Sequence, residues 1–389
     1  MGQVVKKDRR NKQMSVKTVE VVLTEEQNCA VDWLSRNVFR ESYVTLAGFG
    51  GTGKTTVIKT LLQRLPGFAP AAYTGKAAEV LRRKGVGATT IHSLIYAPSE
   101  VEWWDEKEQR NRKRLTFSLK TRQDKSMLPV QGFVIDEASM VSSKLHDDLL
   151  SFCLPLVYVG DHGQLEPVFS EGGFNLMAEP DVKLEKIHRN AGEISRFAQY
   201  LRNGGNPGGW YGQAGCDGSQ VELLEWNDLT DEKLLEHDQA ICAFNITRVE
   251  INKGIRRHLG KPESTPVVGD RVMCLDNSKL YGVFNGMQGV IVAFGKEDGL
   301  DTLVFRCDGI DREAPYVPEQ LNKAKKPEDK DPFGRIGFDY SWCVSCHKFQ
   351  GSEDEKVLVL GQSSGRWSMK RWNYTAASRA KSKLTWVLE

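Results

Sequence analysis

Residues 48–55 read Gly-Phe-Gly-Gly-Thr-Gly-Lys-Thr, and this stretch decides the fold. The apolar run at residues 43–47 predicts a buried strand before it, and residues 55–65 predict a helix that ends at Pro66-Gly67. Glycines between a strand and a helix let backbone N–H groups turn inward and bind phosphate oxygens beside the positive end of the helix. The stretch therefore predicts a phosphate-binding loop in a parallel α/β sheet.

An acidic pair downstream matches this loop. Asp136-Glu137 follows the apolar strand core at residues 133–135. We assign Mg²⁺ binding to Asp136 and the Thr55 hydroxyl, activation of the attacking water to Glu137, and contact with the β- and γ-phosphates to Lys54. Together the two motifs predict hydrolysis of a nucleoside triphosphate. The nucleotide contacts predicted from the loop are Gly50, Gly51, Thr52, Gly53, Lys54, Thr55 and Thr56.

The remaining apolar segments indicate the α/β class. Short strand cores occur at residues 156–159, 240–243, 357–360 and 384–388, each beside helical or turn signals. Upstream, Thr24 and Gln27 have the spacing of a capping box at the start of an amphipathic helix. This alternation predicts parallel sheets covered by helices.

Two segments interrupt the alternation. Residues 98–130 are charged and aromatic, and they predict a β-hairpin whose strands flank a basic turn at Arg110–Arg114. Residues 266–334 contain short strands separated by Gly and Asp, which predict a small β-barrel. We expect a basic tail (1–20), a first α/β unit (21–97 and 131–187) that contains the hairpin, and a second α/β unit (188–265 and 335–389) that contains the barrel.

Charge indicates where a polyanion would bind. The 389-residue chain has a formal net charge of 53 − 51 = +2. Basic residues gather at 107–125, eight against two acidic, and at 361–389, six against one. These blocks fit either a polyanion partner or a solvated surface. Because no apolar run is long enough to cross a membrane and residues 1–17 show no secretion signal, we expect a cytoplasmic protein without a membrane partner.

The cysteines indicate free thiols. The chain has eight, without the spacing of a disulfide framework. Cys343-Val-Ser-Cys346-His347 matches a haem-attachment box, but that chemistry requires export, and a second cysteine pair for zinc is not evident. We therefore expect neither haem nor zinc at this pattern.

Seven motifs in a fixed order give the chain a family resemblance. They are residues 23–27 (Leu-Thr-Glu-Glu-Gln), 48–55, 136–140 (Asp-Glu-Ala-Ser-Met), 160–167 (Gly-Asp-His-Gly-Gln-Leu-Glu-Pro), 186–189 (Lys-Ile-His-Arg), 346–353 and 374–380. In this order they resemble the superfamily 1 helicases of the RecD/Dda-like branch, from Leu23 to the C-terminus. The resemblance implies two RecA-like P-loop NTPase domains, a strand-separating pin in the first insertion and an SH3-like barrel in the second.

The resemblance also implies catalytic roles for particular residues. Gln27 would read the adenine edge of ATP, while the capping box explains the same residue, and both interpretations stay open. Gln164 would couple the γ-phosphate to DNA. Arg189 and Arg379 would reach the γ-phosphate as arginine fingers, with a salt bridge between the units as the alternative. The catalytic residues implied are Lys54, Glu137, Gln164, Arg189 and Arg379.

For nucleic acid, the resemblance implies a groove for single-stranded DNA. Hydroxyl, amide and cationic groups would hold phosphates, and histidines and aromatic rings would stack on bases. The family usually has proline at position 73, where Tyr73 would either stack on a base or pack in the core. Trp103 and Trp104 would stack at a duplex junction or pack the hairpin on the core. The DNA contacts implied are Tyr73, Thr74, Lys76, Thr90, His92, Trp103, Trp104, His347 and Lys348.

The expected function is that of an ATP- and Mg²⁺-dependent DNA helicase. It would move 5′→3′ along single-stranded DNA, a direction implied by resemblance alone, and separate forked duplexes as a monomer. Replication, recombination or repair would use it, with a single-strand-binding or replisome protein as candidate partner, and its short core fits a phage or plasmid protein. Two alternatives stay open: an RNA helicase of the same superfamily, and a nucleotide-gated DNA-binding subunit of a larger recombination or nuclease complex.

Overall fold

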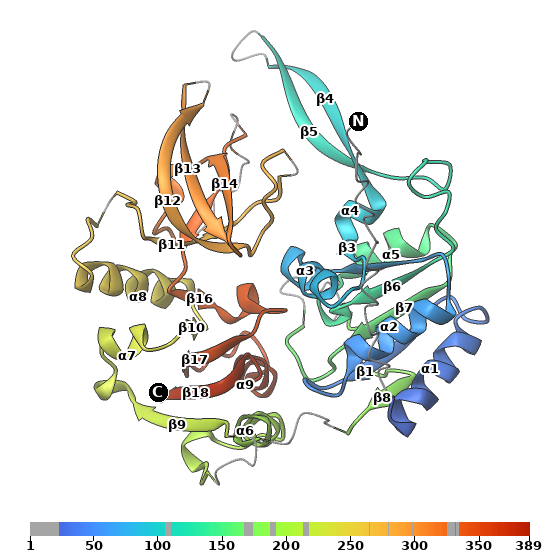
Figure 1. Ribbon diagram of the computed structural model, residues 1–389, viewed down its shortest axis with the longest axis horizontal. Helices are drawn as coiled ribbons and strands as arrows, with labels where there is room; N and C mark the ends of the chain where they lie inside the picture. The colour runs from blue at the N-terminus through green and yellow to red at the C-terminus, as the bar shows by residue number, and fades with distance from the viewer. Residues whose placement is uncertain are drawn as a thin grey trace, which may run out of the picture.

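The computed structural model describes residues 23–105, 110–166, 174–186, 192–212 and 218–389, except 264, 279, 298, 325–330, 332 and 333. Within these residues, two α/β units lie side by side, and an antiparallel sheet and a long hairpin stand above them (Figure 1). The expected basic tail and Arg189 lie outside the described residues. No described helix is long and apolar enough to span a membrane.

The first unit is built on a parallel sheet with six described strands in the order β3-β2-β6-β7-β1-β8. Its strands are β1 (Val44–Gly48), β2 (Phe68–Ala72), β3 (Thr89–Thr90), β6 (Gly132–Asp136), β7 (Leu156–Gly160) and β8 (Val182–Leu184). Its helices are α1 (Glu25–Asn37), α2 (Lys54–Arg64), α3 (Gly75–Arg83), α4 (Ile91–Ile95) and α5 (Ser143–Leu150). Strands β1 and β7 are buried along their whole length, as strands covered on both faces are. The predicted strand–loop–helix at 43–65 is confirmed.

The second unit has a parallel sheet with five strands in the part of the chain that the structure describes, ordered β16-β10-β17-β18-β9. Its strands are β9 (Gln220–Glu225), β10 (Gln239–Cys242), β16 (Cys343–Ser345), β17 (Asp354–Leu360) and β18 (Ala380–Leu388). Its helices are α6 (Glu193–Arg202), α7 (Asp231–Leu235), α8 (Asn245–His258) and α9 (Met369–Ala377). The haem-like cysteines Cys343 and Cys346 are fully buried here, beside Cys242 of the neighbouring strand.

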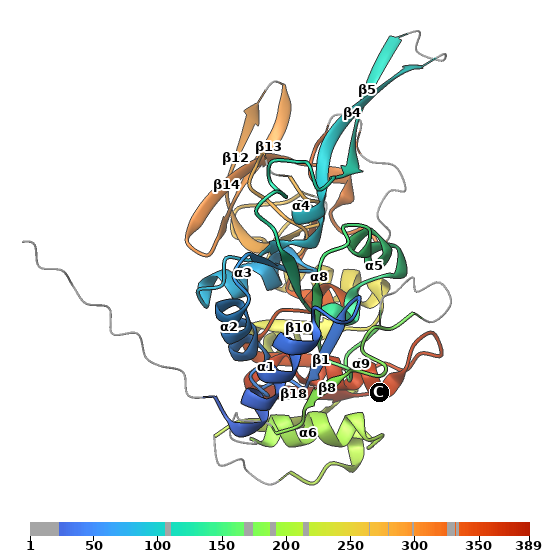
Figure 2. The same cartoon turned by 90° about the vertical axis from the view of Figure 1, so that its right-hand side faces the viewer.

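The first insertion forms an antiparallel hairpin of β4 (Tyr96–Asp105) and β5 (Arg110–Leu119), which projects from the body of the protein (Figure 2). Residues 110–114 each have a backbone partner on β4, so the expected basic turn at Arg110–Arg114 is wrong: these residues belong to a strand. Their polarity misled the prediction, because a two-stranded ribbon does not need a buried apolar face along its length. After Leu119 the chain returns to the first unit, where Met127 and Val130 are buried in the core.

The second insertion forms an antiparallel sheet, with described strands in the order β14-β13-β12-β11-β15. These strands are β11 (Arg271–Cys274), β12 (Gln288–Glu297), β13 (Leu300–Cys307), β14 (Ile310–Pro315) and β15 (Phe338–Tyr340). Strand β15 lies beyond the expected 266–334 segment, and three residues are too few to show a periodicity in the sequence. The buried face of this sheet and one side of the second unit share a hydrophobic core.

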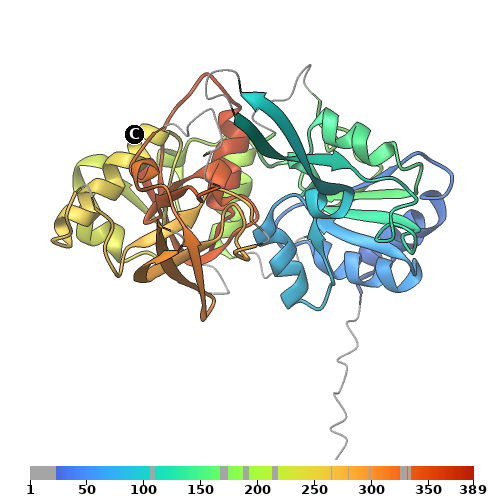
Figure 3. The ribbon, with the colours of Figure 1, turned by 90° about the horizontal axis from the view of Figure 1, so that it is seen from above.

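The two units and the inserted sheet contact one another directly. Phe49 and Leu165 of the first unit are buried in a core made mostly by the second unit. Above them, the Arg83 guanidinium on α3 forms an ion pair with Asp308, in the turn between β13 and β14. A Cβ at Gly75 would lie 2.2 Å from the ring of Phe284, so glycine permits that close approach. Figure 3 shows the two units and the insertions from above.

Candidate functional site

The phosphate loop joins β1 to α2 and depends on glycine. Gly51 and Gly53 have φ angles of 85° and 86°, which residues with a Cβ avoid. The N–H and the hydroxyl of Thr52 both donate to the Phe49 carbonyl, at 3.2 and 2.9 Å. Lys54 Nζ donates to the carbonyls of Gly48 and Phe49, at 2.6 and 3.1 Å. The ammonium group therefore lies over the loop, where phosphates would bind at the N-terminus of α2.

Gln27 connects this loop to α1. Its Oε1 accepts from the Thr24 N–H at 3.1 Å, and its own N–H donates to Thr24 Oγ1 at 3.3 Å, so the predicted capping box is confirmed. Its Nε2 donates to the Thr52 carbonyl at 3.0 Å. A Cβ at Gly53 would lie 2.3 Å from this nitrogen. One side chain thus caps α1 and supports the phosphate loop, while its contact with adenine stays a prediction.

Asp136 and Glu137 lie at the end of β6, on the sheet edge that also carries the phosphate loop, because parallel strands end at the same edge. Glu137 has a left-handed backbone, φ 55°, which is strained for a residue with a side chain. Burial and the neighbouring Asp136 carboxylate raise the pKa of Glu137 to about 7, and the charges of Arg379 and Lys54 oppose the rise. A carboxyl group with a pKa near neutrality suits proton transfer from water.

The residues assigned to Mg²⁺ fit an ion that arrives with the nucleotide. Burial raises the pKa of Asp136, while Lys54 and Lys84 oppose that rise. Thr55 Oγ1 accepts from Lys84 Nζ at 3.4 Å. Nowhere in the described ranges do three His, Cys, Asp or Glu side chains gather as a metal site. One carboxylate and one hydroxyl suffice for Mg²⁺, which completes its shell with phosphate oxygens and water.

The segment after β7 places buried polar atoms at the same edge. Asp161 is fully buried and accepts from the Gly163 N–H at 2.9 Å and from Gln164 Nε2 at 3.3 Å. Within the described residues, Gln164 Oε1, His162 Nδ1 and Ser139 Oγ are buried without a hydrogen-bond partner. Because buried polar atoms are nearly always paired, these three fit an edge that receives a polar ligand.

Arg379 reaches this edge from the second unit. It is 4% exposed, and its Nε, Nη1 and Nη2 donate to the Thr375 carbonyl at 3.0 Å, the Ser352 carbonyl at 3.2 Å and Ser378 Oγ at 2.9 Å. These oxygens orient the guanidinium close enough to Glu137 for its charge to oppose the rise in the pKa of that carboxyl group. The hydrogen bonds that hold Arg379 thus go to carbonyl and hydroxyl oxygens.

Several residues between the units had no role predicted from the sequence. The Arg202 guanidinium of α6 lies 3.6 Å from the ring centroid of Phe49. A cavity of about 540 Å³ opens beside this pair and is also lined by His162, Lys370 and Arg371. Arg371, Tyr374 and Thr375 of α9 contact the segment after β7. Their i, i+3, i+4 spacing was a signal that could have identified them as one helix face.

Two of the residues expected to bind DNA, Thr74 and Lys76, lie where α3 meets the second unit. Lys76 Nζ lies 5.4 Å from the ring centroid of Phe349, and burial lowers the pKa of this lysine. A Cβ at Gly351 would lie 3.2 Å from Thr74 Oγ1. The Thr74 and Thr90 hydroxyls cap α3 and α4 by accepting backbone N–H groups at 3.1 Å. His92 is exposed, one turn before Tyr96 on the hairpin strand β4.

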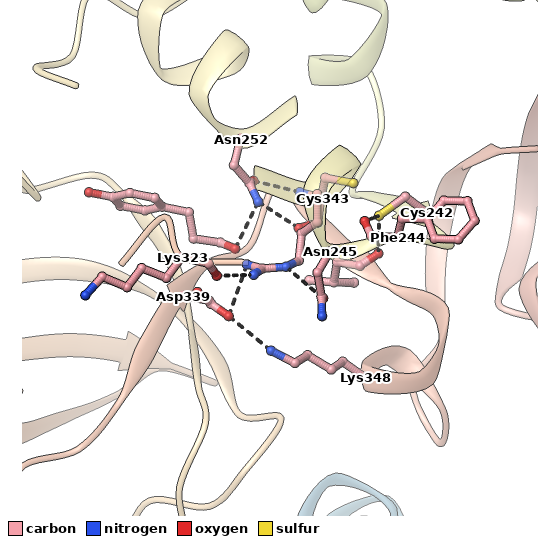
Figure 4. Close-up of polar contacts among 11 residues, drawn as sticks. Cys242, Phe244, Asn245, Asn252, Lys323, Asp339, Cys343 and Lys348 are labelled. Atoms are coloured by element: carbon pink, nitrogen blue, oxygen red, sulfur yellow. Dashed lines mark hydrogen bonds and ion pairs between the residues drawn. The ribbon is translucent and has the colours of Figure 1, made fainter. Parts of the chain in front are cut away.

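Other expected DNA contacts have partners within the protein. Lys348 Nζ lies 3.0 Å from Asp339 Oδ2, which also binds Arg248 Nη1 at 3.0 Å (Figure 4). The His347 ring lies 5.7 Å from that of Trp367. Tyr73 is partly buried against the core of the first unit, which agrees with the core alternative for this residue.

Two further positions lie on the hairpin. Trp103 and Trp104 pair along the backbone with Arg112 and Asn111 of β5. Their side chains lie outside what the structure describes. Their stacking role therefore stays a prediction.

Comparison with known proteins now identifies the family. The model of the AAA domain family matches residues 22–216, half of the chain, and that of the UvrD-like helicase C-terminal domain matches residues 340–387. The ATP-dependent DNA helicase dda of phage T4 is 31% identical over 202 residues, which cover 47% of this chain and 43% of that protein. The chain belongs to the AAA domain family and, with its helicase C-terminal match and its likeness to Dda, to the superfamily 1 helicases.

A second curated relative and two solved structures show how much of each protein's length this superfamily 1 helicase covers and which fold it shares. The conjugal transfer protein TraA of Agrobacterium fabrum is 26% identical over 376 residues, which cover 88% of this chain and 30% of that protein. The chain therefore spans less than half the length of each of these two relatives, TraA and Dda. Bacteroides Pif1 in complex with ADP-AlF3 and single-stranded DNA matches with a TM-score of 0.58 and 21% identity, over 94% of this chain and 92% of that one. Candida albicans Pif1 matches with a TM-score of 0.53 and 20% identity, over 95% of each chain. These structures share the mixed α/β fold with parallel sheets.

Proposed function

We propose that this superfamily 1 helicase hydrolyses ATP to move 5′→3′ along single-stranded DNA and to separate duplex DNA. One observation carries the proposal: the phosphate loop with Lys54 over it and the Asp136-Glu137 pair lie at one sheet edge, and Arg379 of the second unit is held close to Glu137. Because cations from both α/β units face one carboxylate, the rate of hydrolysis would depend on the relative position of the two units. The direction rests on the family resemblance.

Each polar group at this edge has a proposed task. The N–H groups of residues 50–56 and Lys54 hold the phosphates, and Gln27 contacts adenine. Thr55 and Asp136 would hold Mg²⁺, which would neutralise charge at the phosphates when bound. Glu137 accepts the proton of the attacking water, and Arg379, with Arg189, stabilises charge on the γ-phosphate. Gln164, whose Oε1 has no hydrogen-bond partner among the described residues, changes position when nucleotide binds and so couples nucleotide binding to DNA binding.

The two insertions and the groove between the units have proposed roles in binding and separating DNA. We assign the β4–β5 hairpin as the strand-separating pin, the antiparallel sheet as an SH3-like barrel, and the two units as RecA-like domains of a monomer. Thr74, Lys76, Thr90, His92, His347 and Lys348 line the proposed groove for single-stranded DNA. Lys348 must leave Asp339 to hold a phosphate there, so its contact would be made only with DNA bound.

Unwinding of forked duplexes tests the function directly. We expect the purified chain with ATP and Mg²⁺ to separate a duplex that carries a 5′ single-stranded tail and to leave one with only a 3′ tail intact. A strand-displacement assay with a fluorescent strand measures both. Unwinding from the 3′ tail alone contradicts the direction. Absence of unwinding from either tail, with ATPase activity intact, favours the subunit of a larger complex.

A second expectation concerns the nucleic acid. Single-stranded DNA should stimulate the ATPase rate, and its binding should weaken with salt with a log–log slope of roughly −0.7 for each phosphate neutralised, because binding releases condensed counterions. Fluorescence anisotropy with oligo-dT at several salt concentrations measures the slope. An oligonucleotide of the same length in RNA is the control. Greater stimulation by RNA would favour the RNA helicase alternative, and binding independent of salt would contradict a phosphate-holding groove.

A further inference from the structure

Helix α9 places one face against the first unit. The Arg371 guanidinium donates through Nη1 to the Gln164 carbonyl at 3.1 Å. The Thr375 hydroxyl accepts from the Leu165 N–H at 3.0 Å and donates to the Arg371 carbonyl at 2.7 Å. From the neighbouring turn of the second unit, Gln350 Nε2 donates to the Leu165 carbonyl at 3.4 Å. The second unit therefore holds the Gln164-Leu165 backbone through several polar contacts.

Tyr374, on the same face, contacts the phosphate loop as well. Its hydroxyl donates to Asp161 Oδ2 at 2.8 Å and accepts from the Gly50 N–H at 3.2 Å. The side chain is 4% exposed, and its ring lies so close to Gly163 that a Cβ there would stand 2.9 Å from a ring carbon. Burial raises the pKa of Tyr374 far above its ordinary value, so the hydroxyl keeps its proton and stays a donor.

These contacts form a chain of hydrogen bonds from Gly50 through Tyr374 and Asp161 to Gln164. Gly50 belongs to the loop that would hold phosphates, and Gln164 has an unpaired oxygen at the same edge. A phosphate that draws the Gly50 N–H inward removes a donor from the Tyr374 hydroxyl. Because Asp161 is fully buried, its other hydrogen bonds must then adjust, including the bond from Gln164 Nε2.

We propose that Tyr374 is a positioning residue that couples occupation of the phosphate loop to the placement of Gln164, and through it to the affinity for single-stranded DNA. The proposal rests on the function proposed above, because it assigns the coupling between the two ligands to one hydroxyl group. Coupling between two ligands is reciprocal, so it can be measured as a binding effect without turnover.

Tyr374→Phe tests the proposal, because it removes one oxygen and keeps the buried ring. The dissociation constant of oligo-dT is measured by anisotropy with and without AMP-PNP and Mg²⁺, in the full chain. The wild-type chain should show a change of about 5- to 150-fold on addition of nucleotide, the usual range for coupled sites. In Tyr374→Phe the ratio should fall to within about twofold of one. The DNA-stimulated kcat should also fall ~10- to 100-fold, with the KM for ATP changed less than threefold, since the lost hydrogen bond connects sites rather than holding substrate.

Tyr200→Phe is the matched control, because the Tyr200 hydroxyl also donates to an oxygen, the Asn206 carbonyl at 3.1 Å, but within the second unit. It should keep the wild-type ratio. If Tyr374→Phe keeps the wild-type ratio of oligo-dT dissociation constants with and without AMP-PNP, the inference is overturned. A lowered melting temperature, together with equal losses in kcat and in the affinity for each ligand, also overturns it, because that result marks a merely structural role. A wild-type chain that binds neither AMP-PNP nor oligo-dT overturns the proposed function itself, which is a separate result.

Discussion

Glu137→Gln is expected to bind ATP and single-stranded DNA normally and to hydrolyse ATP about 10²- to 10⁴-fold more slowly, the usual contribution of a general base. The amide keeps the size of the carboxyl group but does not accept a proton from water. Binding should survive because Asp136 and Thr55 remain available to Mg²⁺. Steady-state ATPase measurements with oligo-dT, together with a fluorescent-nucleotide titration, check both halves of the expectation.

Two companion variants make this result specific. Lys54→Ala should lose turnover and also weaken ATP binding, because it removes the cation that lies over the phosphate loop. Glu355→Gln is the matched control: Glu355 is exposed and pairs only loosely with Lys381, at 3.7 Å, so its loss should leave the rate unchanged. A wild-type rate in Glu137→Gln would refute water activation by this residue.

A shortened hairpin is expected to keep DNA-stimulated ATPase activity and single-strand translocation but to lose most unwinding. Glu100 pairs with Leu115 and Val101 with Arg114, so replacing residues 101–114 by Asn-Gly keeps the lower ladder in register and closes it with a two-residue turn. A deletion of residues 103–117 would instead remove Phe117, the partner of Pro98, and leave the strands unequal. Stacking of a base on an aromatic ring contributes ~1–3 kcal/mol, so losing it should slow unwinding of a fork about 10- to 100-fold.

The control for this experiment separates aromatic stacking from hairpin length. A double variant, Trp103→Ala with Trp104→Ala, keeps the backbone ladder and removes both rings. If stacking acts at the junction, it should reproduce the loss of unwinding seen with the shortened hairpin. Normal unwinding by the shortened chain rules out the pin assignment, and loss of its ATPase activity shows that the hairpin is needed for folding of the first unit.

Local patterns predicted much of the fold. The strand–loop–helix around residues 48–55, the capping box of Thr24 and Gln27, and strands β1, β6, β7, β10, β17 and β18 of the parallel sheets were predicted, because each depends on local spacing or on a run of apolar residues. The short or less apolar strands β3, β8, β9 and β16 were not. Strand β2 was not predicted: its sequence, Phe-Ala-Pro-Ala-Ala, contains a proline and little of the β-branched character of a strand. Its pairing with β3 and β6 in the sheet overrides that weak local preference.

Side-chain partners were less predictable than elements. Lys348 was expected to hold DNA phosphate, but the buried carboxylate of Asp339 holds its ammonium group. Asp339 belongs to β15, a strand of three residues that is too short to recognise from its sequence. No pattern near Lys348 therefore predicted this ion pair. Tyr73, just after β2, is partly buried against the core of the first unit, and the sequence did not distinguish this from base stacking because that core is assembled from distant segments.

The sequence by itself determined the chemistry available along the chain: a loop whose glycines permit left-handed backbone, a lysine and a threonine behind it, and two adjacent carboxylates after a strand. These depend on neighbours within a few residues, and steric rules act at that range. Only the tertiary structure decided which groups meet. Gly50 and Tyr374 are 324 residues apart, and Asp161 and Tyr374 are 213 apart, yet one hydroxyl joins them. Such contacts follow from the packing of two separate sheets, which no local periodicity encodes.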